Sequence, residues 1–280
     1  MRRSPRLAAA SATALSLVLV TAGCAGASGA AESADDSTIT IGFNPGPYFE
    51  MFQEGILPIL EEDGYTVQTK DFTDGVIVNV AVRDGEIDAN IMQHSVYMDS
   101  VNEQEGLSNV ALVQVPGPPM ALFGGAQKSL DDLKKGAKIS VPNQPSNQYR
   151  ALTVLEDADL ITVSAEMDPA TASLQDIVDN PYDLEFVEME NAQQVAALQD
   201  VDYAVIQGNF VVSGGLKLAD ALTLEDLTDE FSVVVSVDEA HADSDWAQAL
   251  KDAYESDEFA DYIASNEIYD GYNLPAALED

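Results

Sequence analysis

The sequence of 280 residues contains little cysteine, histidine or positive charge. It has one cysteine, two histidines, and 12 Lys and Arg residues against 49 Asp and Glu residues. A single cysteine cannot form an internal disulfide, so the fold must depend on its hydrophobic core. The formal net charge of −37 argues against binding to nucleic acid or to anionic lipid, and we interpret it as an aid to solubility.

Signatures of common catalytic sites are also absent from the sequence. It contains no Walker A phosphate loop, no HExxH zinc motif and no GxSxG nucleophile motif. The only histidines, His94 and His241, are far apart in the chain, and His241 lies in the acidic segment AHADSD. A zinc site or a Ser/His/Asp triad is therefore not expected. The sequence predicts a protein that is not an enzyme and that needs no metal or cofactor.

Residues 1–23 have the pattern of a secretion signal. Three arginines precede an apolar run from Leu7 to Val20, which is too short to span a bilayer comfortably. The first two arginines also occur in twin-arginine signals, but Ser4 and Pro5 fit that pattern poorly, and we expect general secretion. Removal of the three arginines with the signal would change the net charge from −37 to −40.

Cys24 directly follows small residues, at the position where a bacterial lipoprotein is cleaved and lipidated. The alternative is a buried structural cysteine, but no apolar core pattern surrounds Cys24. The next residues, AGASGAAESADDS, are small and polar without periodicity, which is typical of a flexible tether. Residues 24–37 are therefore predicted to be a lipidated cysteine and a tether that anchor the protein to the cell membrane, on its extracytoplasmic face.

Strand and helix patterns alternate along the rest of the chain. Strands are expected at 38–43, 65–72, 87–91, 110–115, 139–141, 184–187, 203–206 and 231–237. Helices are expected at 48–63, 76–82, 95–105, 129–133, 151–158, 193–198 and 245–266. This alternation predicts an α/β protein with mostly parallel sheets that are covered on both faces.

A Pro-Gly-Pro-Pro segment at 116–119 separates two α/β series, and the late strand at 231–237 returns to the first. The sequence therefore predicts two lobes, lobe 1 at 38–117 plus 232–280 and lobe 2 at 118–231. In open α/β sheets, ligands bind beyond the carboxyl ends of the strands. We expect a ligand cleft between the lobes.

The segment Ile139–Leu152, ISVPNQPSNQYRAL, has the pattern of a strand, a loop and a helix, with Arg150 in the first turn of the helix. Outside the signal, Arg150 and Arg83 are the only arginines. A guanidinium close to the amides of Asn143 and Asn147 and to free helix N–H groups is suited to bind an anion. The segment predicts a site for a ligand carboxylate.

Polar residues also follow other predicted strands. Gln93 and His94 follow the strand at 87–91, and with Tyr97 they would offer donors and an aromatic ring to a ligand. The alternative, to which we give equal weight, is that His94 satisfies backbone groups at a turn. Asn44 ends the strand at 38–43 in the same way.

The strand at 203–206 is followed by Gln207, Gly208 and Asn209. The glycine would allow the backbone to approach a ligand, and the two amides would donate or accept hydrogen bonds. A plain turn explains the Gly-Asn pair equally well.

Four stretches together resemble the NlpA-type methionine-binding lipoproteins, the substrate-binding subunits of a methionine ABC importer. In chain order they are GEIDANIMQHSVYMD (85–99), ISVPNQPSNQYRAL (139–152), DIVDNPYDLEFVEMENAQ (176–193) and AVIQGNFV (204–211). The resemblance covers nearly all of the chain after the tether. It implies a two-lobed periplasmic-binding-protein fold of type 2 that closes on a free amino acid.

The resemblance also implies roles for the residues at the strand ends. Arg150 and Asn147 would hold the ligand carboxylate, and His94 and Tyr97 would line the pocket. Gln207 or Asn209 would help to fix the α-amino group.

The side-chain end of the site departs from the family pattern. The family usually has an aromatic residue where Asp74 and Gly75 stand, Phe at Met92, Pro at Val96 and Asn at Gln207. Fewer aromatic residues would hold a methionine side chain less firmly. Another apolar amino acid or a short peptide therefore stays an alternative ligand.

These observations predict a monomeric, lipid-anchored solute-binding protein that captures an amino acid, with methionine as the first candidate. It would deliver the ligand to the permease and ATPase subunits of an ABC importer. The alternatives are an enzyme on the same scaffold and a surface lipoprotein with no role in transport.

Overall fold

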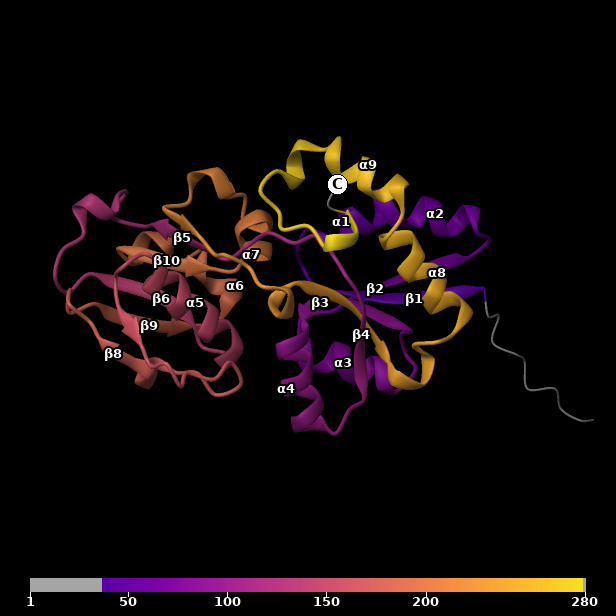
Figure 1. Ribbon diagram of the computed structural model, residues 1–280, viewed down its shortest axis with the longest axis horizontal. Helices are drawn as coiled ribbons and strands as arrows, with labels where there is room; N and C mark the ends of the chain where they lie inside the picture. Colours follow the sequence, from indigo (N-terminus) through magenta and orange to yellow (C-terminus); the bar gives the residue numbers. More distant parts are fainter. Residues whose placement is uncertain (1–36, 279–280) are drawn as a thin grey trace, which may run out of the picture. The chain divides into compact units, whose positions relative to one another are not determined.

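The computed structural model describes residues 37–278, which form two α/β lobes, each built on a five-stranded sheet (Figure 1). The predicted signal, Cys24 and the tether up to residue 36 lie outside the described residues. Within the described part, no helix is both long and apolar enough to cross a membrane.

The sheet of lobe 1 has the strand order β2-β1-β3-β12-β4. Its strands are β1 (Thr38–Phe43), β2 (Thr66–Asp71), β3 (Ala89–His94), β4 (Asn109–Gln114) and β12 (Val233–Asp238). β1 runs parallel to β2 and β3, whereas β12 lies antiparallel between β3 and β4. The late strand β12 therefore returns to the first sheet, as the sequence predicted.

Helices from both ends of the chain cover this sheet (Figure 1). They are α1 (Tyr48–Met51), the π-helical turn η1 (Phe52–Ile56), α2 (Leu57–Glu62), α3 (Gly75–Arg83), α4 (Ser95–Glu105), α8 (Asp245–Tyr254) and α9 (Asp257–Ala264). Short 3₁₀ turns follow at η7 (Glu239–His241), η8 (Glu267–Tyr269) and η9 (Ala276–Leu278).

The sheet of lobe 2 has the order β11-β5-β10-β6-β9. Its strands are β5 (Ala121–Gly124), β6 (Lys138–Pro142), β9 (Glu185–Met189), β10 (Tyr203–Ile206) and β11 (Thr223–Leu224), and β7 (Thr162–Val163) pairs separately with β8 (Ile177–Asp179). The helices are α5 (Pro145–Asp157), α6 (Asn191–Gln194) and α7 (Gly208–Ser213). Its 3₁₀ turns are η2 (Leu130–Asp132), η3 (Leu174–Asp176), η4 (Leu198–Asp200), η5 (Leu218–Asp220) and η6 (Asp229–Phe231).

The expectation of mostly parallel sheets is wrong for one half of each sheet. β12 pairs antiparallel in lobe 1, and β5 pairs antiparallel with β10 and β11 in lobe 2. β5 and β11 are four and two residues long, too short for a periodic pattern to reveal them. The exact lobe boundaries, 38–117 plus 232–280 and 118–231, stay a prediction.

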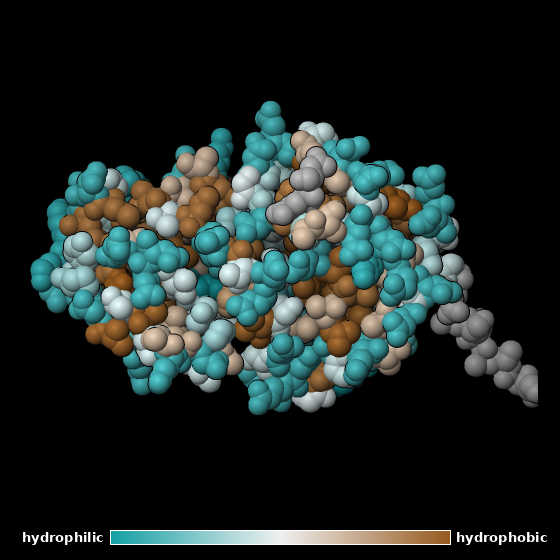
Figure 2. All heavy atoms as spheres, in the orientation of Figure 1, coloured by the Kyte–Doolittle hydropathy of each residue, from teal (hydrophilic) through white to brown (hydrophobic). Residues whose placement is uncertain are grey.

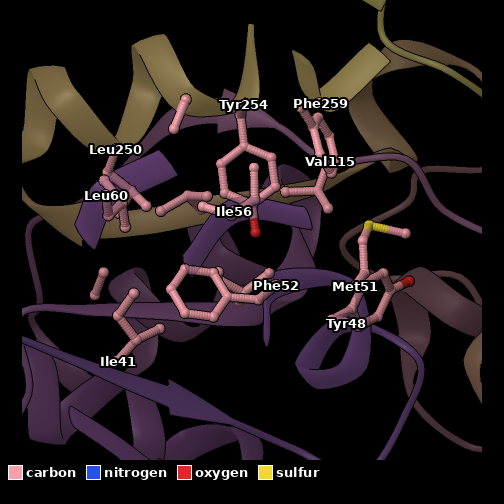
Figure 3. Close-up of a cluster of buried hydrophobic side chains, with 14 of the residues drawn as sticks. Ile41, Tyr48, Met51, Phe52, Ile56, Leu60, Val115, Leu250, Tyr254 and Phe259 are labelled. Atoms are coloured by element: carbon pink, nitrogen blue, oxygen red, sulfur yellow. The ribbon is translucent and has the colours of Figure 1, made fainter. Parts of the chain in front are cut away.

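The core of lobe 1 lies between the N-terminal and C-terminal helices and the sheet. Figure 3 shows Phe52 and Ile56 beside Leu250 and Tyr254 from α8, and all four side chains are buried. Burial of each such side chain stabilises the fold by roughly 1.5–3 kcal/mol. The single helix expected at 48–63 is interrupted by the π-helical turn, where a Cβ on Gly55 would lie 2.7 Å from Cδ1 of Tyr262.

Two chain segments cross between the lobes, and we call residues 115–120 the first crossover and residues 225–232 the second. They are hydrogen-bonded to each other, because the Glu225 N–H donates to the Met120 carbonyl over 2.8 Å. Near the C-terminus, Asn273 exchanges backbone hydrogen bonds of 2.9 and 3.1 Å with Gly117. The crossovers therefore form a joined structure rather than two independent loops.

Hydrophilic and hydrophobic residues are intermixed on the face drawn in Figure 2. Only three ion pairs occur among residues 37–278, so most carboxylates of the described part have no basic partner. The large negative net charge favours solubility, but the repulsion between the carboxylates opposes the compact fold.

Candidate functional site

A cavity of about 560 Å³ lies between the lobes. Its lining follows the carboxyl ends of β1, β3, β6, β9 and β10, together with residues of both crossovers. This is the position at which α/β proteins bind ligands, and the volume suits a small molecule. The polar lining residues are Asn44, Gln93, His94, Tyr97, Gln144, Asn147, Arg150, Glu190, Asn191, Gln207 and Asn209.

All but one of the predicted ligand-binding residues line this cavity. The exception is Asn143, which is exposed and donates from Nδ2 to Oε1 of Glu190 over 2.8 Å. Its backbone N–H bonds to the Met189 carbonyl, which continues the pairing of β6 with β9 and directs the side chain away from the cavity. Asn143 therefore supports a residue of the rim and does not line the site.

Arg150 lines the cavity, but the expectation that it lies in the first turn of a helix is wrong. α5 begins at Pro145, a residue whose fixed φ suits the first helical position. Arg150 is the sixth residue of α5, in its second turn. The free N–H groups of the helix start lie one turn before it.

Arg150 forms a buried ion pair with Glu225 of the second crossover. Its Nε and Nη2 donate to Oε1 and Oε2 of Glu225 over 2.7 and 2.6 Å, and both side chains are 6% exposed. The guanidinium carbon also lies 5.5 Å from the ring centre of Phe231. Two of the five guanidinium N–H groups are therefore occupied by Glu225, and those on Nη1 are available to a ligand.

Glu225 was not predicted from the sequence. It lies 75 residues from Arg150, after a strand too short to be recognised. Nothing in the local pattern TLEDLTDE distinguishes this carboxylate from the many acidic residues that face solvent.

Asn147 holds a central place among the polar lining residues. Its Oδ1 accepts from Nε2 of Gln207 over 2.6 Å and lies 3.3 Å from Nε2 of His94, and its Nδ2 donates to Oε1 of Gln144 over 3.1 Å. The contact with His94 joins the two lobes across the cleft. Oε1 of Gln144 also accepts from Asn191, so the amide NH₂ of Gln144 faces the cavity without a bond in the described part.

His94 is buried and has both ring nitrogens in hydrogen bonds. Nδ1 accepts from the Tyr97 backbone N–H at the start of α4, so the ring proton lies on Nε2 and is donated to Asn147. Burial, together with the positive charge of Arg150, lowers the pKa of His94 to about 3. The ring is therefore neutral at physiological pH, and it serves both the turn and the site.

Gln93 was predicted to contact the ligand, but its amide is already bonded within lobe 1. It exchanges hydrogen bonds of 2.7 and 2.6 Å with Asn79 of α3, and Oδ1 of Asn79 also accepts from Asn90 and Asn109. All four side chains are buried, and we call them the lobe 1 amide cluster. Asn79 was missed, although one Asn within the apolar helix sequence GVIVNVAV was an available signal.

Gly208 was expected to let the backbone approach a ligand, and the structure shows a different neighbour. A Cβ at Gly208 would lie 2.2 Å from the carbonyl oxygen of Pro118, so this glycine allows a close approach to the first crossover. Gly208 also lines the cavity, and its contact with a ligand stays a prediction. Gln207 and Asn209, on either side, both line the cavity. Asn44 also lines it, and its Oδ1 is buried with no hydrogen-bond partner in the described part.

The remaining lining is mostly apolar and includes Met92, Tyr97, Val195, Phe210 and Phe231. A Cβ at Gly75 would lie 2.6 Å from the Tyr97 hydroxyl oxygen and 2.9 Å from Cε of Met92. Tyr97 and Met92 therefore occupy the space that a side chain at position 75 would need. Burial raises the pKa of Tyr97, with added effects of Asp74 and Glu190, so its hydroxyl stays protonated.

No group of three or more His, Cys, Asp or Glu side chains within residues 37–278 is arranged to hold a metal ion. The chemistry that the cavity offers is binding through amides, one guanidinium and apolar surface.

Comparisons with known proteins agree with these features. The profile of a family described as NlpA lipoprotein matches residues 39–277. The methionine-binding lipoprotein MetQ of Bacillus subtilis is 31% identical over 270 residues, which are 93% of this chain and 97% of that protein. A probable D-methionine-binding lipoprotein MetQ of Vibrio cholerae is 30% identical over 254 residues, 90% of this chain and 91% of the relative.

Solved structures give the same result for the fold. A nutrient binding protein from Burkholderia cenocepacia bound to methionine has a TM-score of 0.78 and 34% identity, and covers 84% of this chain and 98% of its own. A further structure, described as the methionine binding protein MetQ, has a TM-score of 0.77 and 30% identity, and covers 85% of this chain and 97% of its own. The two-lobed periplasmic-binding-protein fold that the sequence predicted is confirmed.

Proposed function

The chain belongs to the NlpA lipoprotein family, and from this premise we propose that it captures a free amino acid, methionine first, and delivers it to an ABC importer. We propose further that it acts as a monomer anchored through a lipid on Cys24 to the extracytoplasmic face of the cell membrane. The permease and ATPase of the importer are its proposed partners. Support comes from the relatives, which are named as methionine-binding lipoproteins.

One observation carries the choice of ligand class: the cavity offers donors, an unsatisfied acceptor and apolar surface together. A free apolar amino acid has a carboxylate, an ammonium group and an apolar side chain, and each has a complement here. Convergent polar groups within an apolar pocket are typical of small-molecule sites.

The carboxylate is proposed to lie against Arg150 and Gln144. Nη1 of Arg150 and the amide NH₂ of Gln144 are donors in this part of the lining that have no partner among residues 37–278. Asn147 donates a hydrogen bond to Oε1 of Gln144 and so holds the Gln144 amide in position. A charge-assisted hydrogen bond from Nη1 would be the strongest single contact.

The ammonium group is proposed to lie near Asn44, Gln207 and Asn209. Oδ1 of Asn44 is a buried acceptor that lacks a partner among residues 37–278. A hydrogen bond from a ligand N–H to this atom would favour binding, because it would remove the cost of a buried acceptor without a partner. Gln207 donates from Nε2 to Asn147, which leaves its Oε1 as a further acceptor.

The apolar side chain is proposed to contact Met92, Tyr97, Val195 and Phe210. A thioether suits such a lining because sulfur makes favourable contacts with aromatic rings. Bonds between the lobes, such as that of His94 with Asn147, would exclude water from the bound ligand and strengthen its polar contacts. The closed form would then present both lobes to the permease.

The test is mass spectrometry of the small molecules released when the purified protein is denatured, followed by titration calorimetry. L-methionine, D-methionine, other apolar amino acids and short methionine-containing peptides form the panel. Release or binding of one amino acid is the expected result. A protein that releases nothing and binds no member of the panel would exclude this function and favour a surface lipoprotein with no role in transport.

The anchor needs a separate test. The variant Cys24→Ser is expected to leave the membrane fraction, because a lipid on this cysteine is the proposed means of attachment. A Cys24→Ser protein that stays in the membrane fraction would contradict lipidation at this residue.

A further inference from the structure

Glu225 accepts hydrogen bonds from a backbone N–H as well as from Arg150. Its carboxylate accepts from Nε and Nη2 of Arg150 and, through Oε2, from the Met120 backbone N–H over 2.8 Å. The bonds reach α5 and the first crossover from a residue of the second crossover. The carboxylate is therefore held in place by three donors before any ligand arrives.

The charges at the cavity can be counted from its lining. Among the described residues that line the cavity, Arg150 is the one cationic side chain and Glu190 is the one anionic side chain. Glu225 lies directly behind Arg150 and compensates its charge at hydrogen-bond distance. The site as a whole therefore carries one positive and two negative charges, and it is not a cationic site.

The geometry of the pair also limits how a ligand carboxylate can approach. Glu225 occupies the forked face of the guanidinium that is formed by Nε and Nη2. The ligand is left with the end of the guanidinium at Nη1. The Arg150 side chain cannot rotate freely, because Glu225 and the ring of Phe231 contact its guanidinium from two sides.

We propose that Glu225 determines the charge preference of the site: by neutralising Arg150 it makes the cleft select zwitterions over ligands with net negative charge. This inference rests on the proposed binding of a free amino acid and adds the reason why the ligand must bring its own ammonium group. The site has a net charge of −1, which a zwitterion leaves unchanged and a monocarboxylate without the ammonium would change to −2. A dicarboxylic amino acid would do the same.

The experiment uses three ligands of nearly equal shape. L-methionine is a zwitterion, 4-(methylthio)butanoate is its des-amino anion, and L-methioninamide is a cation. Dissociation constants are measured by titration calorimetry for the wild-type protein, for Glu225→Gln and for the control Asp226→Asn. Asp226 is the next residue in the same crossover and is exposed, so the control removes the same charge away from the cavity.

The expected result is a change in preference and not only in affinity. In Glu225→Gln, the affinity for the anion relative to methionine should rise by about tenfold or more, because the charge of Arg150 is no longer compensated. The affinity for the amide relative to methionine should fall. Asp226→Asn should keep the wild-type ratios.

The variant Glu225→Gln is expected to be less stable than the wild type, because it leaves a buried guanidinium without its counter-charge. If circular dichroism shows that it is unfolded, the double variant Arg150→Gln/Glu225→Gln takes its place. It removes both charges and leaves the net charge of the site unchanged. Methionine and methioninamide should then lose affinity together, to within about tenfold. A loss of more than about a hundredfold for methionine alone would show that Arg150 acts as an uncompensated cation and would overturn the inference.

The outcomes separate the two proposals. If the wild-type protein binds none of the amino acids, the proposed function fails and the inference fails with it. If it binds methionine, but folded Glu225→Gln has the wild-type preference among the three ligands, only the role of Glu225 is overturned.

Discussion

The two lobes contain polar clusters that are built from similar side chains and differ in their hydrogen bonds. Of the lobe 1 amide cluster, Gln93 lines the cavity, and its other three members are not part of the lining. In lobe 1, Asn79, Asn90, Gln93 and Asn109 bond mainly to one another. In lobe 2, Asn147, Gln144 and Arg150 are fixed by partners and still have donors left over. Two buried amide clusters can therefore have different roles, one in stability and one in binding.

The difference follows from the cost of a buried polar group without a partner, about 1–3 kcal/mol. The lobe 1 amide cluster meets most of this cost within the protein, although Oδ1 of Asn109 is buried without a partner in the described part. A cluster with unused donors can recover it only from water or a ligand. We expect variants in lobe 1 to change the free energy of unfolding, and variants in lobe 2 to change ligand affinity.

The largest effect is expected at Arg150, which we expect to contribute both to the free energy of unfolding and to ligand affinity. Arg150→Ala should abolish methionine binding, with a loss of at least about a thousandfold, and should lower the free energy of unfolding by about 3–5 kcal/mol because Glu225 is left buried and unpaired. Calorimetry and urea denaturation measure the two quantities. Arg83→Ala is the matched control, since Arg83 pairs with Asp84 on the surface, and both properties should stay at wild-type values.

A second variant separates stability from binding at this position. Arg150→Met/Glu225→Met replaces the pair by apolar side chains of similar size and should recover most of the lost stability. Binding should remain lost. Recovery of binding in this variant would show that Arg150 does not contact the ligand.

The next effect is expected in the lobe 1 amide cluster. Asn79→Ala removes an acceptor of three bonds and a donor to Gln93, and should lower the free energy of unfolding by about 3 kcal/mol. Methionine affinity of the folded variant should change by less than about threefold. Gln104→Ala, which removes an exposed amide on α4, is the control and should cost less than about 0.5 kcal/mol. A large loss of affinity in Asn79→Ala would break the comparison, because the lobe 1 amide cluster would then take part in binding.

A smaller effect is expected at Asn147. Asn147→Ala should weaken methionine binding by about 10- to 100-fold, since Gln144, Gln207 and His94 lose the bonds that position them. Calorimetry measures this loss. Asn143→Ala is the control from the turn just before α5, because Asn143 does not line the cavity, and its affinity should equal that of the wild type. Equal losses in the two variants would contradict the central position of Asn147.

The smallest effect is the contribution of His94 to pH dependence. The pKa of His94 is about 3 in the folded protein and near 6.5 in an unfolded chain. Between these values the unfolded state binds the extra proton, so the free energy of unfolding falls as the pH decreases below about 6.5, by at most about 1.4 kcal/mol per pH unit. Above pH 6.5 this contribution is constant.

The variant His94→Asn should show a shallower decline of stability than the wild type between pH 6.5 and 5, measured by urea denaturation at each pH. Asparagine keeps an acceptor for the N–H at the start of α4. His241→Asn, at an exposed 3₁₀ turn, is the control. Identical slopes for His94→Asn and the wild type would show that His94 does not remain neutral in the fold.

Local patterns in the sequence located much of the fold. The predicted bounds of β10 and α4 agree with the structure because each has a clear period and clear ends. The order of strand ends also brought the right segments to the cleft, since a parallel arrangement directs their carboxyl ends to one side. The Pro-rich break at 116–119 and the late strand at 231–237 predicted two lobes, and the family resemblance added the periplasmic-binding-protein fold.

Long-range pairing was beyond the reach of those patterns. Glu225 could not be identified as the partner of Arg150, and Gln93 could not be distinguished from Gln144, because both are amides at a strand end. Their difference depends on Asn79 and Asn191, which come near only when the chain is folded. Hydrogen-bond satisfaction is a property of the tertiary structure.

Gly75 has a consequence for how the ligand range of such a protein can change. Its missing side chain leaves room that the Tyr97 hydroxyl and the Met92 methyl fill, and all of this lies at the apolar end of the cavity. Substitution at 75, 92 or 97 would reshape that end while Arg150, Gln144 and Asn147 keep their bonds in the other lobe. In the proposed binding mode, recognition of the amino-acid backbone and recognition of its side chain would be separable traits, so a lineage could exchange one nutrient for another without rebuilding the part that all amino acids share.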